Sequence, residues 1–252
     1  MSNARNLADG ESRFVNTAGD TMTGDLIVDA NVGVGTSSPS TYGGLVVQAA
    51  SGVGSPLTLL TTDAGANAQV VFKGSRQYQI GTGNASSGFA DSLFIYDGTA
   101  GLRMLIDSAG RVTMPYQPAF AVYKTGSQAT NTPAAQLTGW AESFNTGGHF
   151  STATSRFTAP ISGKYLINYT GLHNSGGVGT GYWVRVYLMV NGAIVVDGLG
   201  DNGTYGTYQR LSLSQVLSLN TGDYVTLLAE SSIASSIGVY AGYTNWSGYL
   251  IG

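Results

Sequence analysis

The C-terminal half of the chain alternates apolar and polar positions with a period of two. In residues 163–169, Tyr165, Ile167 and Tyr169 alternate with Leu166 and Asn168. Residues 182–190 repeat the pattern, with Val184, Val186, Leu188 and Val190 on one face and Arg185, Tyr187 and Met189 on the other. A period of two over this length predicts strands that each bury one face.

Turn signals separate these strands. Asn191-Gly192 follows the second strand directly, and this dipeptide is the strongest signal for a two-residue hairpin. A second tight turn is predicted at residues 220–223, and further strands at 119–123, 193–196, 209–219, 224–229 and 246–252. The sequence therefore predicts an antiparallel β-sandwich over residues 119–252, with Phe157, Tyr165 and Trp246 in its core.

The lengths of the connections predict which loops lie together. Long links at residues 173–181, 197–208 and 231–245 alternate along the chain with the tight turns at 191–192 and 220–223. Antiparallel strands reverse direction at each link, so every second link lies at the same end of the sandwich. We expect the three long links at one end and both tight turns at the other.

The long links carry the candidate binding residues. They are rich in Tyr and Asn spaced by Gly and Ser, and the candidates are His173, Asn174, Tyr182, Asp201, Asn202, Tyr205, Tyr208, Tyr240, Tyr243 and Asn245. Such residues combine stacking area with adaptable hydrogen bonding, as in antibody paratopes, and tyrosine rings also stack on sugar faces. The alternative is that these tyrosines close the sandwich or pack between subunits.

Three segments of this region together resemble a known family. They are SRFTAPISGKYLIN at residues 155–168, LNTGDYVTL at 219–227 and WSGYLIG at 246–252. In this order and spacing they resemble the trimeric jelly-roll heads of the complement globular-head family, relatives of tumour necrosis factor. The resemblance implies a homotrimer, a head that binds rather than catalyses, and a head N-terminus at the tight-turn end.

The N-terminal part has shorter β-like segments between stretches of Gly, Ser and Asn. These segments are residues 26–28, 45–47, 57–60, 69–72, 78–80, 93–96 and 104–106. Each is too short to build a large monomeric core, so we expect three copies to intertwine. Residues 26–34 and 105–113 share an apolar pair, an Asp and a small-residue turn, which is typical of hairpins. Two prolines in Met114-Pro-Tyr-Gln-Pro118 indicate an extended connector to the head.

Short motifs in the N-terminal part resemble bacteriophage fibres. GDTMTGDL at residues 19–26 resembles a repeat of tail-fibre shafts, and VGVGTSSP at 32–39 and RMLIDSAG at 103–110 resemble phrases of phage fibre and tailspike proteins. The resemblance implies a virion-attachment segment at residues 1–15 that contacts other virion proteins, a β-rich trimeric shaft at 16–114 and a head at 119–252. It also implies a virion protein assembled in the host cytoplasm.

Composition narrows the classes of function. Glycine accounts for 37 of 252 residues, about twice the usual ~7%, and only 10% of residues are charged against a typical ~25%. The net charge of −3 and the absence of basic runs argue against a nucleic-acid partner. The chain has no cysteine, and its apolar runs are too short to insert in a membrane. Met1 is followed by polar residues, so we expect no secretory signal and release by lysis.

Catalytic and metal-binding motifs are sparse. His149 and His173 lack zinc-motif spacing, and neither a Gly-x-Ser-x-Gly elbow nor a Walker-type Gly-Lys-Ser/Thr occurs. We expect no cofactor and no metal, although Asp201 with Asn202 offers oxygens that suit calcium. A hydrolase acting on surface polysaccharide stays open, because two carboxylates among Asp197, Asp201, Asp223 and Glu230 would suffice.

These observations favour one function over two alternatives. The expected protein is all-β, with an intertwined fibre shaft followed by an antiparallel jelly-roll sandwich, and it is homotrimeric. Its head is expected to bind a host surface glycan or an outer-membrane protein during adsorption, without enzymatic activity. The alternatives are a purely structural tail or capsid decoration fibre and the polysaccharide hydrolase.

Overall fold

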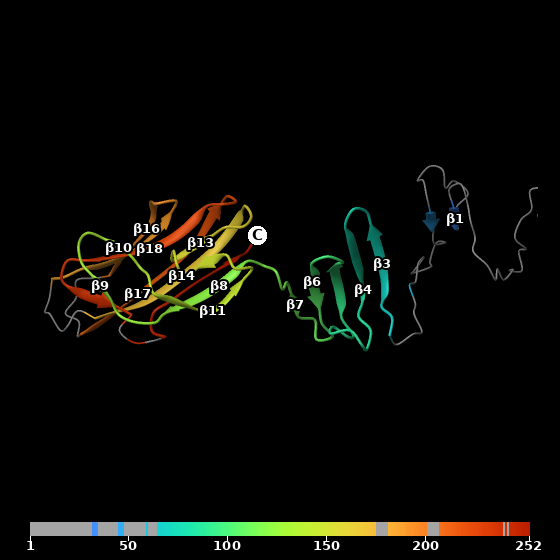
Figure 1. Cartoon of the computed structure of the whole chain (residues 1–252), viewed down its shortest axis with the longest axis horizontal. Coiled ribbons are helices and arrows are strands. Elements are labelled where there is room, and N and C mark those ends of the chain that lie inside the picture. The colour runs from blue at the N-terminus through green and yellow to red at the C-terminus, as the bar shows by residue number, and fades with distance from the viewer. Residues whose placement is uncertain are drawn as a thin grey trace, which may run out of the picture. The chain divides into compact units, whose positions relative to one another are not determined.

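The computed structural model describes residues 32–34, 45–47, 59, 65–174, 181–200, 207–238, 240 and 242–252. The regular elements in these residues are β-strands, as predicted (Figure 1). The chain divides into a unit of Met1–Thr62 and a unit of Asp63–Gly252. Within the described ranges, no helix is long and apolar enough to cross a membrane.

The first unit contains two described strands. β1 (Val32–Val34) and β2 (Leu45–Val47) pair in parallel, with Val32 opposite Leu45. The predicted strand at residues 45–47 is thereby confirmed. The other half of the hairpin predicted over residues 26–34 lies outside the described residues, as do the predicted attachment segment at 1–15 and the repeat at 19–26. Leu59, from the strand predicted at 57–60, is not in a strand.

The second unit begins with an antiparallel five-stranded sheet. Its strands, in order, are β3 (Ala68–Lys73), β4 (Gln77–Thr82), β5 (Leu93–Asp97), β6 (Gly101–Ile106) and β7 (Val112–Thr113). The strands predicted at 69–72, 78–80, 93–96 and 104–106 are confirmed. The hairpin predicted at 105–113 is also confirmed, since Leu105 pairs with Thr113 and the Asp107 carboxylate accepts hydrogen bonds from the backbone N–H groups of Ala109 and Arg111.

A buried carboxylate fixes one end of this sheet. Asp97 has no exposed surface and forms ion pairs with Arg76, at 2.5 Å, and with Arg103, at 2.8 Å. It also accepts hydrogen bonds from the backbone N–H groups of Thr99 and Ala100 in the turn that follows. The hydrogen bond from Arg76 is the largest cause that lowers the pKa of Asp97, which stays ionised. Asp97 therefore ties the end of β5 to Arg76, which precedes β4, and to Arg103 in β6.

The C-terminal region forms a sandwich of two antiparallel sheets. One sheet contains β8 (Ala119–Lys124), β9 (Gln128–Thr130), β11 (Trp140–Thr146), β14 (Gly163–Asn174), β17 (Tyr208–Leu219), β19 (Ser235–Ile237) and β20 (Asn245–Leu250). The other contains β10 (Ala135–Gln136), β12 (Phe150–Ser151), β13 (Arg156–Thr158), β15 (Val184–Val190), β16 (Ala193–Gly200) and β18 (Tyr224–Ser231). The predicted sandwich is confirmed (Figure 1).

An aromatic cluster fills the space between the two sheets. The ring of Phe120 stacks on Phe150 at 5.0 Å and on Phe157 at 4.9 Å, and meets Trp246 edge-on at 5.3 Å. Phe157, Tyr165 and Trp246 are all fully buried, as predicted. Gly248 leaves room for Phe120, because a Cβ atom at this position would lie 2.7 Å from the ring. The core of the sandwich is thus closed within one chain.

The tight turns lie at one end of the sandwich, which we call the turn end. Asn191 and Gly192 have φ angles of 52° and 83°, both in the left-handed region that a two-residue hairpin requires. The Asn191 side chain donates to the Asp223 carboxylate of the second turn at 2.7 Å and accepts from the backbone N–H of Tyr224 at 3.0 Å. The first residues of β8 lie near this end too, because Ala119 pairs with Tyr249 while Tyr165 pairs with Leu250.

The strand ends that flank the long links lie at the opposite end, which we call the loop end. Asn174 is opposite Tyr208, and Val184 is opposite both Gly200 and Ser231. This pairing confirms the predicted alternation of links. The links are shorter than predicted, because β16 continues to Gly200 and because β19 lies inside the link predicted at 231–245.

Two predicted loop residues lie in the interior instead. His173 belongs to β14, which continues to Asn174 because β17 pairs with it along its whole length. The side chain of His173 is 1% exposed and that of Tyr182 is 3% exposed. Residues 182–190 also differ from the prediction, because Tyr187 and Met189 on the outward face are buried and the strand begins only at Val184.

Replacement of Phe157 by Ala should destabilise the sandwich. The fully buried ring stacks on Phe120, so its removal leaves a cavity and should lower the free energy of unfolding by about 3–5 kcal/mol. Chemical denaturation followed by tryptophan fluorescence measures this loss. Phe157→Leu is the matched control and should cost less than about 1.5 kcal/mol. Equal unfolding midpoints for wild type and Phe157→Ala would show that this ring is not part of the core.

Acid should weaken the sandwich through His173. Burial lowers the pKa of His173 from 6.5 to about 4, so the unfolded chain binds a proton in this window that the folded chain does not. Stability therefore falls as the pH falls, by about 2 kcal/mol between pH 7.5 and pH 5. Denaturation midpoints at both pH values measure the change. His173→Leu should remove this part of the pH dependence, whereas His149→Gln should retain it.

Candidate functional site

Three exposed tyrosines form a cluster at the loop end. The rings of Tyr208 and Tyr240 are 5.8 Å apart, and the rings of Tyr240 and Tyr243 are also 5.8 Å apart. The hydroxyl groups of Tyr208 and Tyr240 share a hydrogen bond of 2.9 Å, which raises the pKa of Tyr208. Each of the three side chains is between 43% and 50% exposed. This tyrosine cluster offers aromatic faces to solvent at fixed mutual positions.

The cluster is assembled from two elements. Tyr208 is the first residue of β17, while Tyr240 and Tyr243 precede β20. The backbone N–H of Tyr243 donates to the carbonyl of Tyr240 at 3.3 Å, which folds this segment into a turn. The side chain of Asn245 donates to the carbonyl of Gly242 at 2.7 Å and fixes the turn at the start of β20.

Arg210 lies beside the tyrosine cluster. The guanidinium carbon of Arg210 lies 5.9 Å from the ring centre of Tyr243, within reach of a cation–π contact. Arg210 is two residues from Tyr208 along β17, so both side chains point to the outward face of the sheet. No carboxylate of the described residues forms an ion pair with Arg210. Its charge is therefore available to an anionic group of a ligand.

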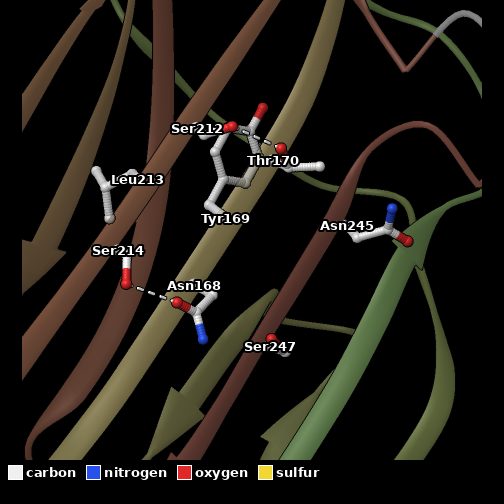
Figure 2. Close-up of a pocket in the computed structure, with 8 residues that line it drawn as sticks. All are labelled: Asn168, Tyr169, Thr170, Ser212, Leu213, Ser214, Asn245 and Ser247. Atoms are coloured by element: carbon white, nitrogen blue, oxygen red, sulfur yellow. Dashed lines mark hydrogen bonds between the residues drawn. The ribbon is translucent and has the colours of Figure 1, made fainter.

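A polar surface continues from Arg210 along the outward face of the same sheet. It consists of Asn168 and Thr170 on β14, Ser212 and Ser214 on β17, and Asn245 and Ser247 on β20. We call these six residues the polar grid, because the strand registers place them in two rows of three. Together with Tyr169 and Leu213 they line an open pocket of about 470 Å³ (Figure 2).

Hydrogen bonds across the strands order the polar grid. The hydroxyl groups of Thr170 and Ser212 share a bond of 2.8 Å, and Ser214 donates to the amide oxygen of Asn168 at 2.8 Å (Figure 2). Each group keeps further donor or acceptor capacity, because a hydroxyl has one hydrogen and two lone pairs and an amide has two hydrogens and two lone pairs. Hydroxyls, amides and neighbouring aromatic rings are the groups that bind the polar edges and apolar faces of sugars.

The structure brings together only part of the predicted site. Tyr208, Tyr240, Tyr243 and Asn245 lie at the loop end with exposed side chains. Asn174 is half-buried at the end of β14, and the side chains of His173 and Tyr182 face the interior. The remaining candidates, Asp201, Asn202 and Tyr205, lie outside the described residues, as does the oxygen pair suggested for calcium.

The sequence prediction missed Arg210 and most of the polar grid. These residues lie on strands, whereas the predicted candidates come from the links. A usable signal was the outward half of each period-two pattern, since Asn168 and Ser212 lie between buried residues and Ser214 follows the buried Leu213.

Of the acidic residues considered for hydrolysis, Asp223 lies apart from Glu230, whereas Asp197 and Glu230 both lie near Arg185 and Asp201 lies outside the described residues. Asp223 is held at the turn end by Asn191 and by the backbone N–H of Asn220. Glu230 accepts a hydrogen bond of 2.8 Å from the hydroxyl of Tyr187 on the other sheet's outward side. Within the described ranges, no group of three or more His, Asp or Glu side chains is placed to hold a metal ion.

Comparison with known proteins places the sandwich in a family. The globular domain of the zebrafish complement 1qA protein is 19% identical, with coverage of 54% of this chain and 98% of that chain and a TM-score of 0.42. Murine APRIL at pH 5.0 is 12% identical, with coverage of 54% and 99% and a TM-score of 0.41. The model of the C1q domain matches residues 119–251, more than half of the chain, and the chain therefore belongs to the C1q domain family.

Proposed function

We propose that this chain is a homotrimeric fibre protein of a bacterial virus and that its C1q domain binds a host surface receptor, glycan or protein, during adsorption. C1q domains are typically non-enzymatic binding modules. The observation that carries the proposal is the tyrosine cluster with Arg210 at the end opposite the chain entry, together with the polar grid that continues from it along the same sheet face. The viral assignment is supported by the motifs at residues 19–26, 32–39 and 103–110.

Association as a trimer is supported by the family, because C1q domains form homotrimers. A trimer would carry three tyrosine clusters at one end, and several weak sites that engage one surface raise the effective affinity by about 10²–10⁴.

The described residues favour a glycan over a flat protein surface as the receptor. Three tyrosine faces and six small polar side chains suit stacking and hydrogen bonding to a sugar. In this proposal the tyrosine cluster stacks on the sugar rings while the polar grid and Arg210 bind hydroxyl or acidic substituents.

The purified chain should be a trimer in solution. Its chain mass is 26.0 kDa, so multi-angle light scattering should give about three times this value. The reason is that C1q domains form homotrimers. A mass of one chain at micromolar concentration would contradict the proposed assembly.

Replacement of Tyr240 by Ala should weaken receptor binding. Tyr240 contacts both other rings of the cluster, so its loss should cost about 2 kcal/mol per head, a factor of ~30. Binding of the fluorescently labelled protein to a panel of bacterial cells and purified lipopolysaccharides measures the effect. Ile194→Ala is the matched control, because Ile194 is 57% exposed against 48% for Tyr240 but lies on β16 of the other sheet, beside the turn at residues 191–192.

Three results would decide between the candidate functions. Retained binding by both Tyr240→Ala and Tyr243→Ala, with the oligomeric mass unchanged, would remove the receptor site from the tyrosine cluster. Adsorption of virions that is independent of this chain would favour the structural decoration fibre. New reducing ends after incubation with host polysaccharide would favour the hydrolase.

A further inference from the structure

The five-stranded sheet before the C1q domain has one face that is almost entirely apolar. We call it the apolar face; its side chains are Val70, Phe72, Tyr78, Ile80, Leu93, Ile95, Met104, Ile106 and Val112. The strand registers place these residues on one side, because directly opposed residues of paired strands share a face. Val70 is opposite Ile80, Ile80 is opposite Ile95, and Ile95 is opposite Met104.

This face is open in the described part of the chain. Six of the nine side chains are exposed, namely Val70, Phe72, Tyr78, Ile80, Leu93 and Val112. With large side chains that are each about half exposed, the face presents on the order of 500 Å² of apolar surface. The largest apolar patch of a typical monomer is of this size and is often an interaction site.

The opposite face of the sheet is different. It carries Gln69, Lys73, Gln77 and Gln79, and its buried aromatic side chain, Phe94, is covered by Phe89 with ring centres 5.0 Å apart. The connection between β4 and β5 thus covers the part of this face around Phe94.

Charges are kept away from the centre of the apolar face. Asp97, which is opposite Tyr78, lies at the end of the sheet and is neutralised by Arg76 and Arg103. Asp107 pairs with Arg111 in the turn between β6 and β7 at 2.6 Å. An uncharged apolar surface with paired charges at its ends suits a partner surface of the same kind.

We propose that the apolar face is the surface by which copies of this chain associate with one another ahead of the C1q domain. The partner is the same face of a second and a third copy. The inference rests on the proposed homotrimer. Only residues 114–118 separate β7 from β8, so a trimer of C1q domains would hold its three sheets on short connectors. The sheets would then meet one another at effective concentrations in the millimolar range.

A pair of neighbouring valines provides the test. Val70 and Val71 are adjacent in β3, and their side chains point to opposite faces of the sheet. They are 39% and 44% exposed in a single chain, so a free sheet would expose both almost equally. The chain contains no cysteine, and Val70→Cys and Val71→Cys therefore each introduce one reactive thiol per full-length chain.

The experiment measures maleimide labelling and distances between copies. In the native full-length protein, we expect Val70→Cys to react at least about tenfold more slowly than Val71→Cys, with equal rates in guanidinium chloride. After nitroxide labelling under denaturing conditions and refolding, pulsed dipolar spectroscopy should give a shorter separation for residue 70 than for residue 71. Each chain carries one label, so every measured separation joins two copies.

Two results would overturn the inference. Equal native labelling rates would show that the apolar face is free. Slow labelling of Val70→Cys without a shorter separation between copies would show that the chain's own residues or another molecule cover the face. Either result, obtained with a trimeric mass and with binding that still depends on Tyr240, would leave the proposed function standing.

Discussion

The C1q domain depends on one strand that pairs on both sides. β14 is twelve residues long and pairs with β17 over its whole length and with β20 and β19 on its other edge. Its inward face supplies Tyr165, Ile167 and Tyr169 to the core, and its outward face supplies Asn168 and Thr170 to the polar grid. Because successive residues of a strand point to opposite faces, the core and the candidate site are fixed by the same backbone. A one-residue change of register would exchange the two sets of side chains.

Sequence periodicity was enough to predict the architecture of this domain. The alternation in residues 163–169 and the Asn191-Gly192 turn gave strands and a hairpin that the structure confirms. The parity of the links also placed the candidate loops at one end, since each link reverses an antiparallel chain. The local sequence is informative here because period-two alternation and turn residues can both be recognised from neighbouring positions in the chain.

Only some of the residues that form the candidate site could be predicted from the sequence. Whether a residue near a strand end lies in the strand depends on pairing with a strand far away in sequence. His173 is drawn into the interior because Gln209 and Ile237 pair with it from two sides. Arg210 gains its position beside Tyr243 in the same way, from a contact that joins β17 to the segment before β20. The tyrosines were found because their loops were recognisable by Gly and Ser content alone.

The two described β-structures of the second unit bury their apolar surface differently. The C1q domain closes its core within one chain, with Phe120 and Trp246 between two sheets. The five-stranded sheet has one layer and covers only Phe94, so most of its apolar side chains have no partner in the described residues. A single sheet with an open apolar face gains little hydrophobic stabilisation until another surface covers it. In the proposed trimer, the C1q domain would hold copies together and the sheet would bury its apolar face by association.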